Sequence, residues 1–145
     1  MAFRFPLAPV LRYRRSLERS AELSLQRVAF EIAQTKSKIE QLTAEIAQAE
    51  AERDQILRQS ITCFELQSML SEATLALEHK RALLDSLVAL EERRKQQMLA
   101  YQAALRDRRV LSDLAARLRE EYELESSRAQ QKQIDDVFGA RAFRR

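Results

Sequence analysis

The chain has 145 residues, of which one is Gly, two are Pro and none is Asn, and its 25 Lys and Arg against 22 Asp and Glu give a net charge of +3. An average chain of this length would carry roughly ten Gly and seven Pro, and the turns of sheets and compact α/β folds depend on these residues. The composition therefore excludes such folds and predicts an all-α protein, a single coiled-coil domain over residues 1–145.

Composition also limits the chemistry of any site. The single His79 and the single Cys63 cannot complete a tetrahedral metal site, and one Gly cannot build a phosphate-binding loop. The longest stretch without a charged residue, 96–105, would span roughly 15 Å as a helix, half the hydrocarbon core of a bilayer. We therefore expect a cytoplasmic protein with no transmembrane segment, no enzymatic activity, and no metal or cofactor.

The two ends of the chain are basic and aromatic, whereas its body is mildly acidic. Residues 1–20 hold five Arg and one Glu, and residues 128–145 hold four Arg, one Lys and two Asp. Four of the six Phe lie at these ends. Aromatic and Arg side chains carry much of the energy of protein interfaces, so the ends are candidate docking segments. Two other interpretations stay open: the Phe side chains fold back on the helices, or the ends bind nucleic acid.

Beyond the first twenty residues, apolar side chains recur at alternating steps of four and three. This heptad period keeps one stripe facing a partner helix, and Pro9 is acceptable at the first helical position. The pattern predicts a helix over about residues 9–58. Its seam residues are Ala21, Leu25, Val28, Ile32, Thr35, Ile39, Leu42, Ile46, Ala49, Arg53 and Ile56.

The pattern fails after residue 56, where a turn is predicted at residues 58–62. Thr62 and Glu65 have the spacing of a capping box, and Ile61 and Leu66 have that of a hydrophobic staple, so a second helix begins near residue 63. The turn has neither Gly nor Pro, and a kinked or partly helical connection is the alternative.

The second predicted helix covers about residues 63–138 and is followed by a basic tail, 139–145. Its seam is imperfect at Glu91 and Arg94, and its register slips beyond Arg108. The charged runs 91–95 and 106–109 are interpreted as solvated faces. The predicted seam residues are Leu66, Leu70, Ala73, Leu77, Lys80, Leu84, Leu87, Met98, Tyr101, Leu105, Leu111, Ala115, Leu118 and Tyr122.

These elements predict a long antiparallel two-helix coiled-coil hairpin in which the longer helix two overhangs helix one. A hairpin of this kind brings both basic ends to the side opposite the turn. The Phe/Arg ends are then the candidate partner-binding residues. They are Phe3, Phe5, Leu7, Arg12, Arg14, Arg15, Phe138, Arg141, Phe143, Arg144 and Arg145.

Both ends also carry a family resemblance. The opening of the chain resembles the start of flagellar export proteins of the FliJ family, and the end, QKQIDDVFGARAFRR, is similar to that family's Lys-x-x-Asp-acidic pair followed by an Arg-rich, aromatic-tipped tail. Gly139 departs from the family pattern, in which the helix runs on. The residues that carry the resemblance are Phe3, Phe5, Leu7, Val10, Leu11, Arg12, Arg14, Lys132, Asp135, Asp136, Arg141, Phe143, Arg144 and Arg145.

The resemblance implies a non-enzymatic component of flagellar type III protein export, and so a role in flagellum biogenesis and motility. It implies an antiparallel coiled coil similar to the central stalk of rotary ATPases. The partners implied are the hexameric export ATPase, the cytoplasmic domain of an export gate membrane protein, and export chaperones. The implied location is the cytoplasmic face of the inner membrane, peripheral and through the export apparatus.

Three other functions fit the same architecture. They are an injectisome stalk protein, a generic coiled-coil scaffold and a basic nucleic-acid tether. Nucleic acid is not expected as the partner, because phosphate binders usually carry more charge than this chain and its acidic body would offset the attraction.

Overall fold

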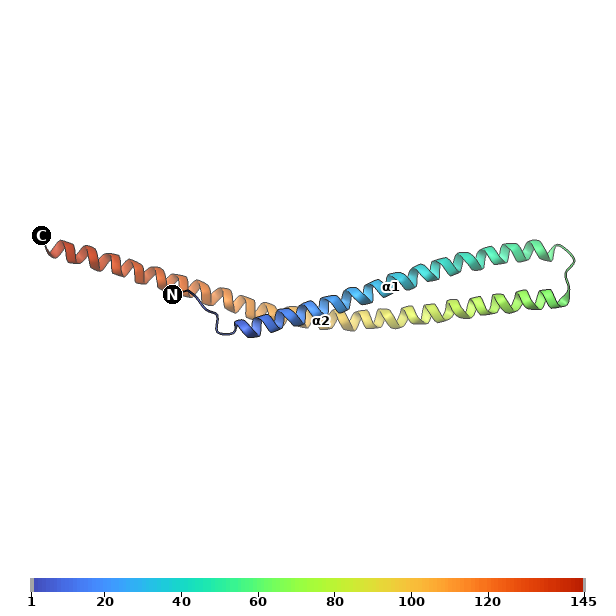
Figure 1. Cartoon of the computed structure of the whole chain (residues 1–145), viewed down its shortest axis with the longest axis horizontal. Helices are drawn as coiled ribbons and strands as arrows, with labels where there is room; N and C mark the ends of the chain where they lie inside the picture. Colours follow the sequence, from blue (N-terminus) through green and yellow to red (C-terminus); the bar gives the residue numbers. More distant parts are fainter. Residues whose placement is uncertain (1, 145) are drawn as a thin grey trace. The chain divides into compact units, whose positions relative to one another are not determined.

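The computed structural model describes residues 2–144, and within them it contains two α-helices and no β-strand. Helix α1 covers Ala8–Leu57 and helix α2 covers Cys63–Phe143, with lengths of 50 and 81 residues. The two helices are joined by the 58–62 connection and run in opposite directions (Figure 1). The predicted all-α two-helix hairpin is confirmed.

Helix α1 begins at Ala8, one residue before the predicted start. The Ala8 N–H donates to the Phe5 carbonyl at 3.1 Å, and the Leu11 N–H donates to the Leu7 carbonyl at 2.9 Å. Pro9 lies in this first turn, where a missing N–H costs no helical hydrogen bond. The helix ends at Leu57, and the Gln59 N–H closes the last turn on the Ile56 carbonyl at 3.0 Å.

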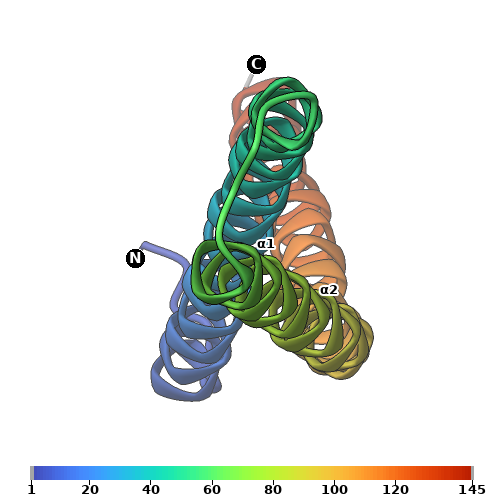
Figure 2. The ribbon, with the colours of Figure 1, turned by 90° about the vertical axis from the view of Figure 1, so that its right-hand side faces the viewer.

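The connection between the helices is irregular over residues 58–62, and α2 starts where the capping residues predicted it. The Glu65 N–H donates to Thr62 Oγ1 at 3.2 Å, so the Thr62 hydroxyl caps the new helix. The Leu66 N–H donates to the Thr62 carbonyl at 3.1 Å. Figure 2 shows this connection, in green, passing from the end of α1 to the start of α2.

Helix α2 was predicted to end at residue 138, but it continues through Gly139 to Phe143. No described residue, Gly or other, has a positive φ, so Gly139 does not form the left-handed turn that ends many helices. A single helical Gly costs only about 1 kcal/mol relative to Ala. That cost is too small to stop the helix, and the separate tail predicted at 139–145 is wrong for residues 139–143.

The chain divides into two compact units. One, called here the hairpin unit, is Glu22–Ala100, and the other, the terminal unit, combines Met1–Ala21 with Tyr101–Arg145. Each unit therefore takes one segment from each helix, and its core is the seam between the two segments.

In the hairpin unit, the α1 seam follows the predicted heptad from Leu25 to Ile46. Val28 is 2% exposed and Ile32 is 5% exposed, and Leu11 in the terminal unit is the other buried side chain among the described residues. Toward the connection the seam loosens, since Ala49 and Ile56 are exposed where burial was predicted. A two-helix layer buries one stripe per helix, so stability depends on few side chains.

The α2 seam differs from its prediction at one of the two core positions in each heptad. Leu70, Leu77 and Leu84, which were predicted to lie in the seam, are exposed. The residue before each of them, Met69, Ala76 or Leu83, is partly buried instead. The observed seam of the hairpin unit consists of Leu66, Met69, Ala73, Ala76, Lys80, Leu83, Leu87 and Leu90.

The register slip predicted beyond Arg108 is also wrong. The seven-residue spacing that starts at Leu66 also passes through Tyr101, Arg108 and Tyr122, all of which are partly buried. One heptad frame therefore fits α2 through position 122. The slip was predicted because Leu70, Leu77 and Leu84 were assigned to the seam in place of Met69, Ala76 and Leu83, which put the first part of α2 one residue out of register with Leu111 and Leu118.

Candidate docking surface in the terminal unit

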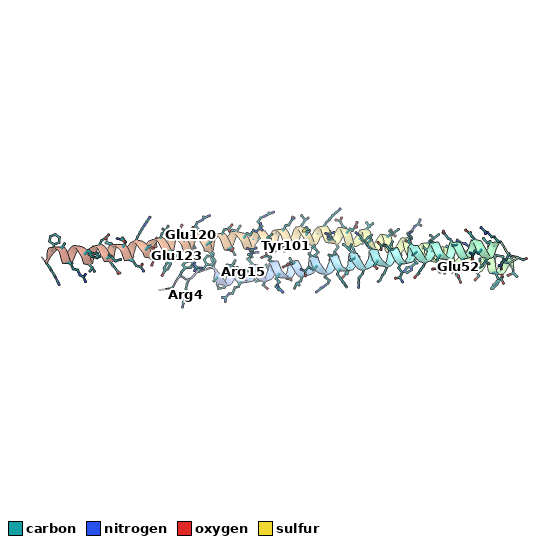
Figure 3. The ribbon with its side chains drawn as sticks, turned by 90° about the horizontal axis from the view of Figure 1, so that it is seen from above. Arg4, Arg15, Glu52, Tyr101, Glu120 and Glu123 are labelled. Carbon is teal, nitrogen blue, oxygen red and sulfur yellow. The ribbon has the colours of Figure 1, made fainter. Side chains whose placement is uncertain are left out.

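Residues 2–7, called here the N-terminal strap, precede α1 and fold back on α2. The Phe3 ring packs on Tyr122 with 5.6 Å between ring centroids and an interplanar angle of 41°. Tilted aromatic pairs at such separations are favourable beyond the area they bury. Figure 3 labels Arg4 in the strap and Glu120 and Glu123 on the stretch of α2 that the strap approaches. Phe3 is therefore part of an intramolecular surface, as the fold-back interpretation of the sequence proposed.

Two ion pairs, called here the polar clamp, join α1 to α2 next to the strap. Arg108 Nε donates to Glu18 Oε2 at 2.7 Å and Arg108 Nη2 donates to Glu18 Oε1 at 3.2 Å, with both side chains about three-quarters or more covered. Arg14 Nη1 donates to Asp107 Oδ2 at 3.2 Å in a more exposed pair. The bidentate geometry of Arg108 on a carboxylate fixes direction as well as distance.

The clamp also changes the titration of Glu18. The hydrogen bond from Arg108 lowers the pKa of Glu18 below its ordinary value of 4.5 and is the largest effect. Burial, the second largest, opposes it, and the charges of Arg108, Arg109 and Arg15 lower the pKa further. The same hydrogen bond raises the pKa of Arg108. Both partners are therefore charged at neutral pH, and the pair stabilises the terminal unit in that state.

Sequence reasoning missed this clamp because it interpreted the charged run 106–109 as a solvated face. The heptad register of the two helices was the signal that could have revealed the pair. Glu18 lies one heptad before Leu25, and Arg108 falls on the seam of α2, so two opposite charges occupy positions that normally hold apolar side chains. The clamp also bears on Arg14, a predicted docking residue, because its guanidinium already has a partner within the chain.

The C-terminal segment, residues 127–144, is exposed at every described position. Phe138 is 64% exposed and Phe143 is 96% exposed, and Arg141 and Arg144 are exposed beside them. Arg145 lies outside the described residues. This segment of α2 has the character of a free helical surface with a basic, aromatic end.

The two groups of predicted docking residues do not form one patch. The strap meets α2 at Tyr122, and α2 then continues for roughly 30 Å, at 1.5 Å per residue, to Phe143. Phe5 is partly covered, whereas Leu7, Arg12 and Arg15 are exposed. Figure 3 shows Arg15 on α1 and Tyr101 on the facing stretch of α2. The terminal unit thus presents two surfaces, one at the strap and clamp and one at the C-terminal segment.

A family model described as flagellar FliJ protein matches residues 3–145 of the chain. The chain belongs to the FliJ family. No curated protein and no solved structure matches it. The matched range includes residues 3–7 of the strap, the clamp and the C-terminal segment, and this FliJ-family chain is a component of flagellar protein export.

Three further observations concern this FliJ-family chain. No helix in the described part of the chain is long and apolar enough to cross a membrane. Among residues 2–144, no group of three or more His, Cys, Asp or Glu side chains is arranged to hold a metal ion. Cys63 is exposed at the start of α2.

Proposed function

We propose that this FliJ-family chain acts as a stalk-like, non-enzymatic partner of the hexameric export ATPase and docks on it through the terminal unit. The observation that supports this most directly is the C-terminal segment, which is exposed at every described position from 127 to 144, is helical as far as Phe143, and carries two Phe and two described Arg near its end. Exposed aromatic and Arg side chains on a rigid element are the usual anchors of a protein interface.

Docking of this kind would promote assembly of the ATPase ring. A ligand shifts an equilibrium only by its differential affinity for the two states. A helix that contacts several subunits of a ring binds the ring better than it binds single subunits, so it stabilises the hexamer by mass action. ATP hydrolysis would then increase, although the chain itself hydrolyses nothing.

Family membership also suggests further partners, which we include in the proposal. They are the cytoplasmic domain of the export gate membrane protein and the export chaperones, which the chain would escort between cycles. The chain would then work in the cytoplasm, held at the inner membrane through the export apparatus. The hairpin unit, with its exposed apolar side chains near the 58–62 connection, is available for contacts that the terminal unit does not make.

The experiment measures the rate of ATP hydrolysis by the cognate export ATPase against the concentration of the added chain. The decisive variant replaces Arg12, Arg141 and Arg144 with Glu, three exposed residues that leave the Arg14–Asp107 pair intact. We expect the parent to raise the rate and to increase the fraction of hexamer, and the variant to lose both effects. Circular dichroism checks that helix content is unchanged.

A matched control changes charge equally in the hairpin unit. Arg81, Arg93 and Lys95 are also exposed, and their replacement by Glu gives the same change in net charge. This control should stimulate the ATPase as the parent does. If the terminal variant stimulates as well as the parent, or if both variants fail equally, docking through the terminal unit is refuted.

A further inference from the structure

The hairpin unit contains a groove that its own side chains do not fill. It encloses about 590 Å³ between α1 and α2 near the 58–62 connection, and its lining runs over residues 42–56 and 69–77. Small residues, Ala49 and Ala73, face this part of the seam, and their side chains leave space between the helices. Leu70 and Leu77, which also line the groove, are 51% and 55% exposed.

The groove has an acidic rim around an apolar floor. The ionisable residues among its lining are Glu45, Glu50, Glu52, Glu72 and Arg53, which sum to a net charge of −3. Such a groove suits an amphipathic helix whose apolar face is flanked by positive charge. Its size lies within the range in which proteins bind compact apolar groups.

The same chain carries a helix of that description. Ile134, Val137 and Phe138, at helical spacings of three and four, share one face of the C-terminal segment and are 49%, 51% and 64% exposed. Arg141 follows on this face at the same spacing. Asp135 is engaged on its own helix, because Gln131 Nε2 donates to Asp135 Oδ1 at 3.0 Å. Asp135 keeps its charge, because the Gln131 amide is neutral, but residues 127–144 hold Arg128, Lys132, Arg141 and Arg144 against Asp135 and Asp136, a net charge of +2. The segment is therefore apolar on this face and positively charged in sum.

We infer that the groove of one copy binds the C-terminal segment of a second copy. Both surfaces are unfilled, they are opposite in charge, and they occur in equal numbers because each chain carries one of each. The contact is heterologous, since a groove meets a segment and not another groove. Such a contact closes into a ring where the rotation between copies allows it and otherwise grows as an open chain, and in both cases the assembly increases with concentration.

The inference is independent of the proposed function, although both use the C-terminal segment. Sedimentation velocity of the purified full chain without any ATPase tests it alone. Over about 1 to 100 µM, the average mass should rise above the 16.9 kDa of the monomer. Because opposite charges line the contact, the rise should be smaller in high salt.

Two variants and their mixture make the test specific. Leu77→Glu disables the groove and Val137→Glu disables the segment, and each variant alone should remain a monomer. An equimolar mixture should form a complex of twice the monomer mass and no larger, because each partner supplies the surface that the other lacks. Leu75→Glu, at an exposed site outside the groove lining, should assemble as the parent does.

Four results would overturn the inference. A parent that stays monomeric over the whole concentration range excludes the contact between copies. A monomeric mixture of the two variants excludes pairing of groove with segment. Loss of assembly in Val137→Glu but not in Leu77→Glu points to a symmetric dimer of segments. Equal loss in Leu75→Glu shows that added charge, and not the groove, is responsible. Circular dichroism confirms that each variant is folded.

Discussion

The narrow seam of the hairpin unit makes Ile32 a sensitive position. Its side chain is 5% exposed, and Ile32→Ala removes three carbon atoms from the seam. At about 0.8 kcal/mol for each buried carbon, the loss of transfer free energy is roughly 2.4 kcal/mol. The cavity contribution should be small because a two-helix layer can close over the gap, so the total falls at the low end of the range for Ile→Ala in protein cores.

The assay is thermal or urea denaturation followed by circular dichroism at 222 nm. We expect a free energy of unfolding lower by about 2 to 3 kcal/mol, which corresponds to a fall in melting temperature of roughly 10 °C. Phe30→Ala is the matched control: it removes a larger apolar side chain two residues away, but Phe30 is 64% exposed. That change should stay within about 0.5 kcal/mol of the parent. If Phe30→Ala destabilises the chain as much as Ile32→Ala, the assignment of the seam is refuted.

Three further predictions concern the terminal unit. Because the pKa of Glu18 is lowered in the folded state, its pair with Arg108 contributes its full stabilisation above pH 4.5 and loses it as the pH falls through the folded-state pKa. Glu18→Gln should therefore lower the melting temperature at neutral pH and make the fall in melting temperature toward acid pH less steep. Equal profiles of melting temperature against pH for the parent and the variant would contradict this. Gly139→Ala places a methyl group where nothing lies within 4 Å, and Ala loses less conformational entropy than Gly on entering a helix. Hydrogen exchange of the backbone amides in the surrounding turns should therefore slow, with a gain of about 0.5 to 1 kcal/mol in local stability. Faster exchange would show that residue 139 is not helical. Phe3→Ala removes the ring that packs on Tyr122, so limited proteolysis should cut the strap faster while helix content is unchanged; an unchanged rate of cleavage would show that this contact does not hold the strap.

Local sequence signals were sufficient for the starts of the helices. Thr62 accepts a hydrogen bond from the Glu65 N–H, and Pro9 lies in the first turn of α1, as their types and spacing predicted. Signals for the end of α2 were weaker. A single Gly139 suggested a stop, but a helical Gly costs little and no left-handed turn forms there. A stop needs a favourable alternative conformation as well as a poor helix former.

The polar clamp shows what residue types alone could not assign. Glu18 and Arg108 are 90 positions apart, and either is ordinary on a solvated helix face. Their pairing depends on the antiparallel register, which brings position 18 opposite position 108. The strap is similar, because its Phe side chains suit both an exposed anchor and a fold-back contact. Only the position of Tyr122 on the neighbouring helix selects the second arrangement.

The sequence by itself determined the class of fold and the seam of α1. There, each step except Thr35 holds one large apolar residue whose immediate neighbours are polar or Ala, so the heptad has one solution from Leu25 to Ile46. In α2, adjacent apolar pairs such as Met69 and Leu70, or Leu83 and Leu84, give two solutions. Residues three and four positions ahead lie about 60° to one side and about 40° to the other of the same line along the helix. A residue at either spacing can therefore face a partner helix. The side from which α1 packs on α2 decides between them, and it places Met69 and Leu83 in the seam. That side is set only when the two helices pack together.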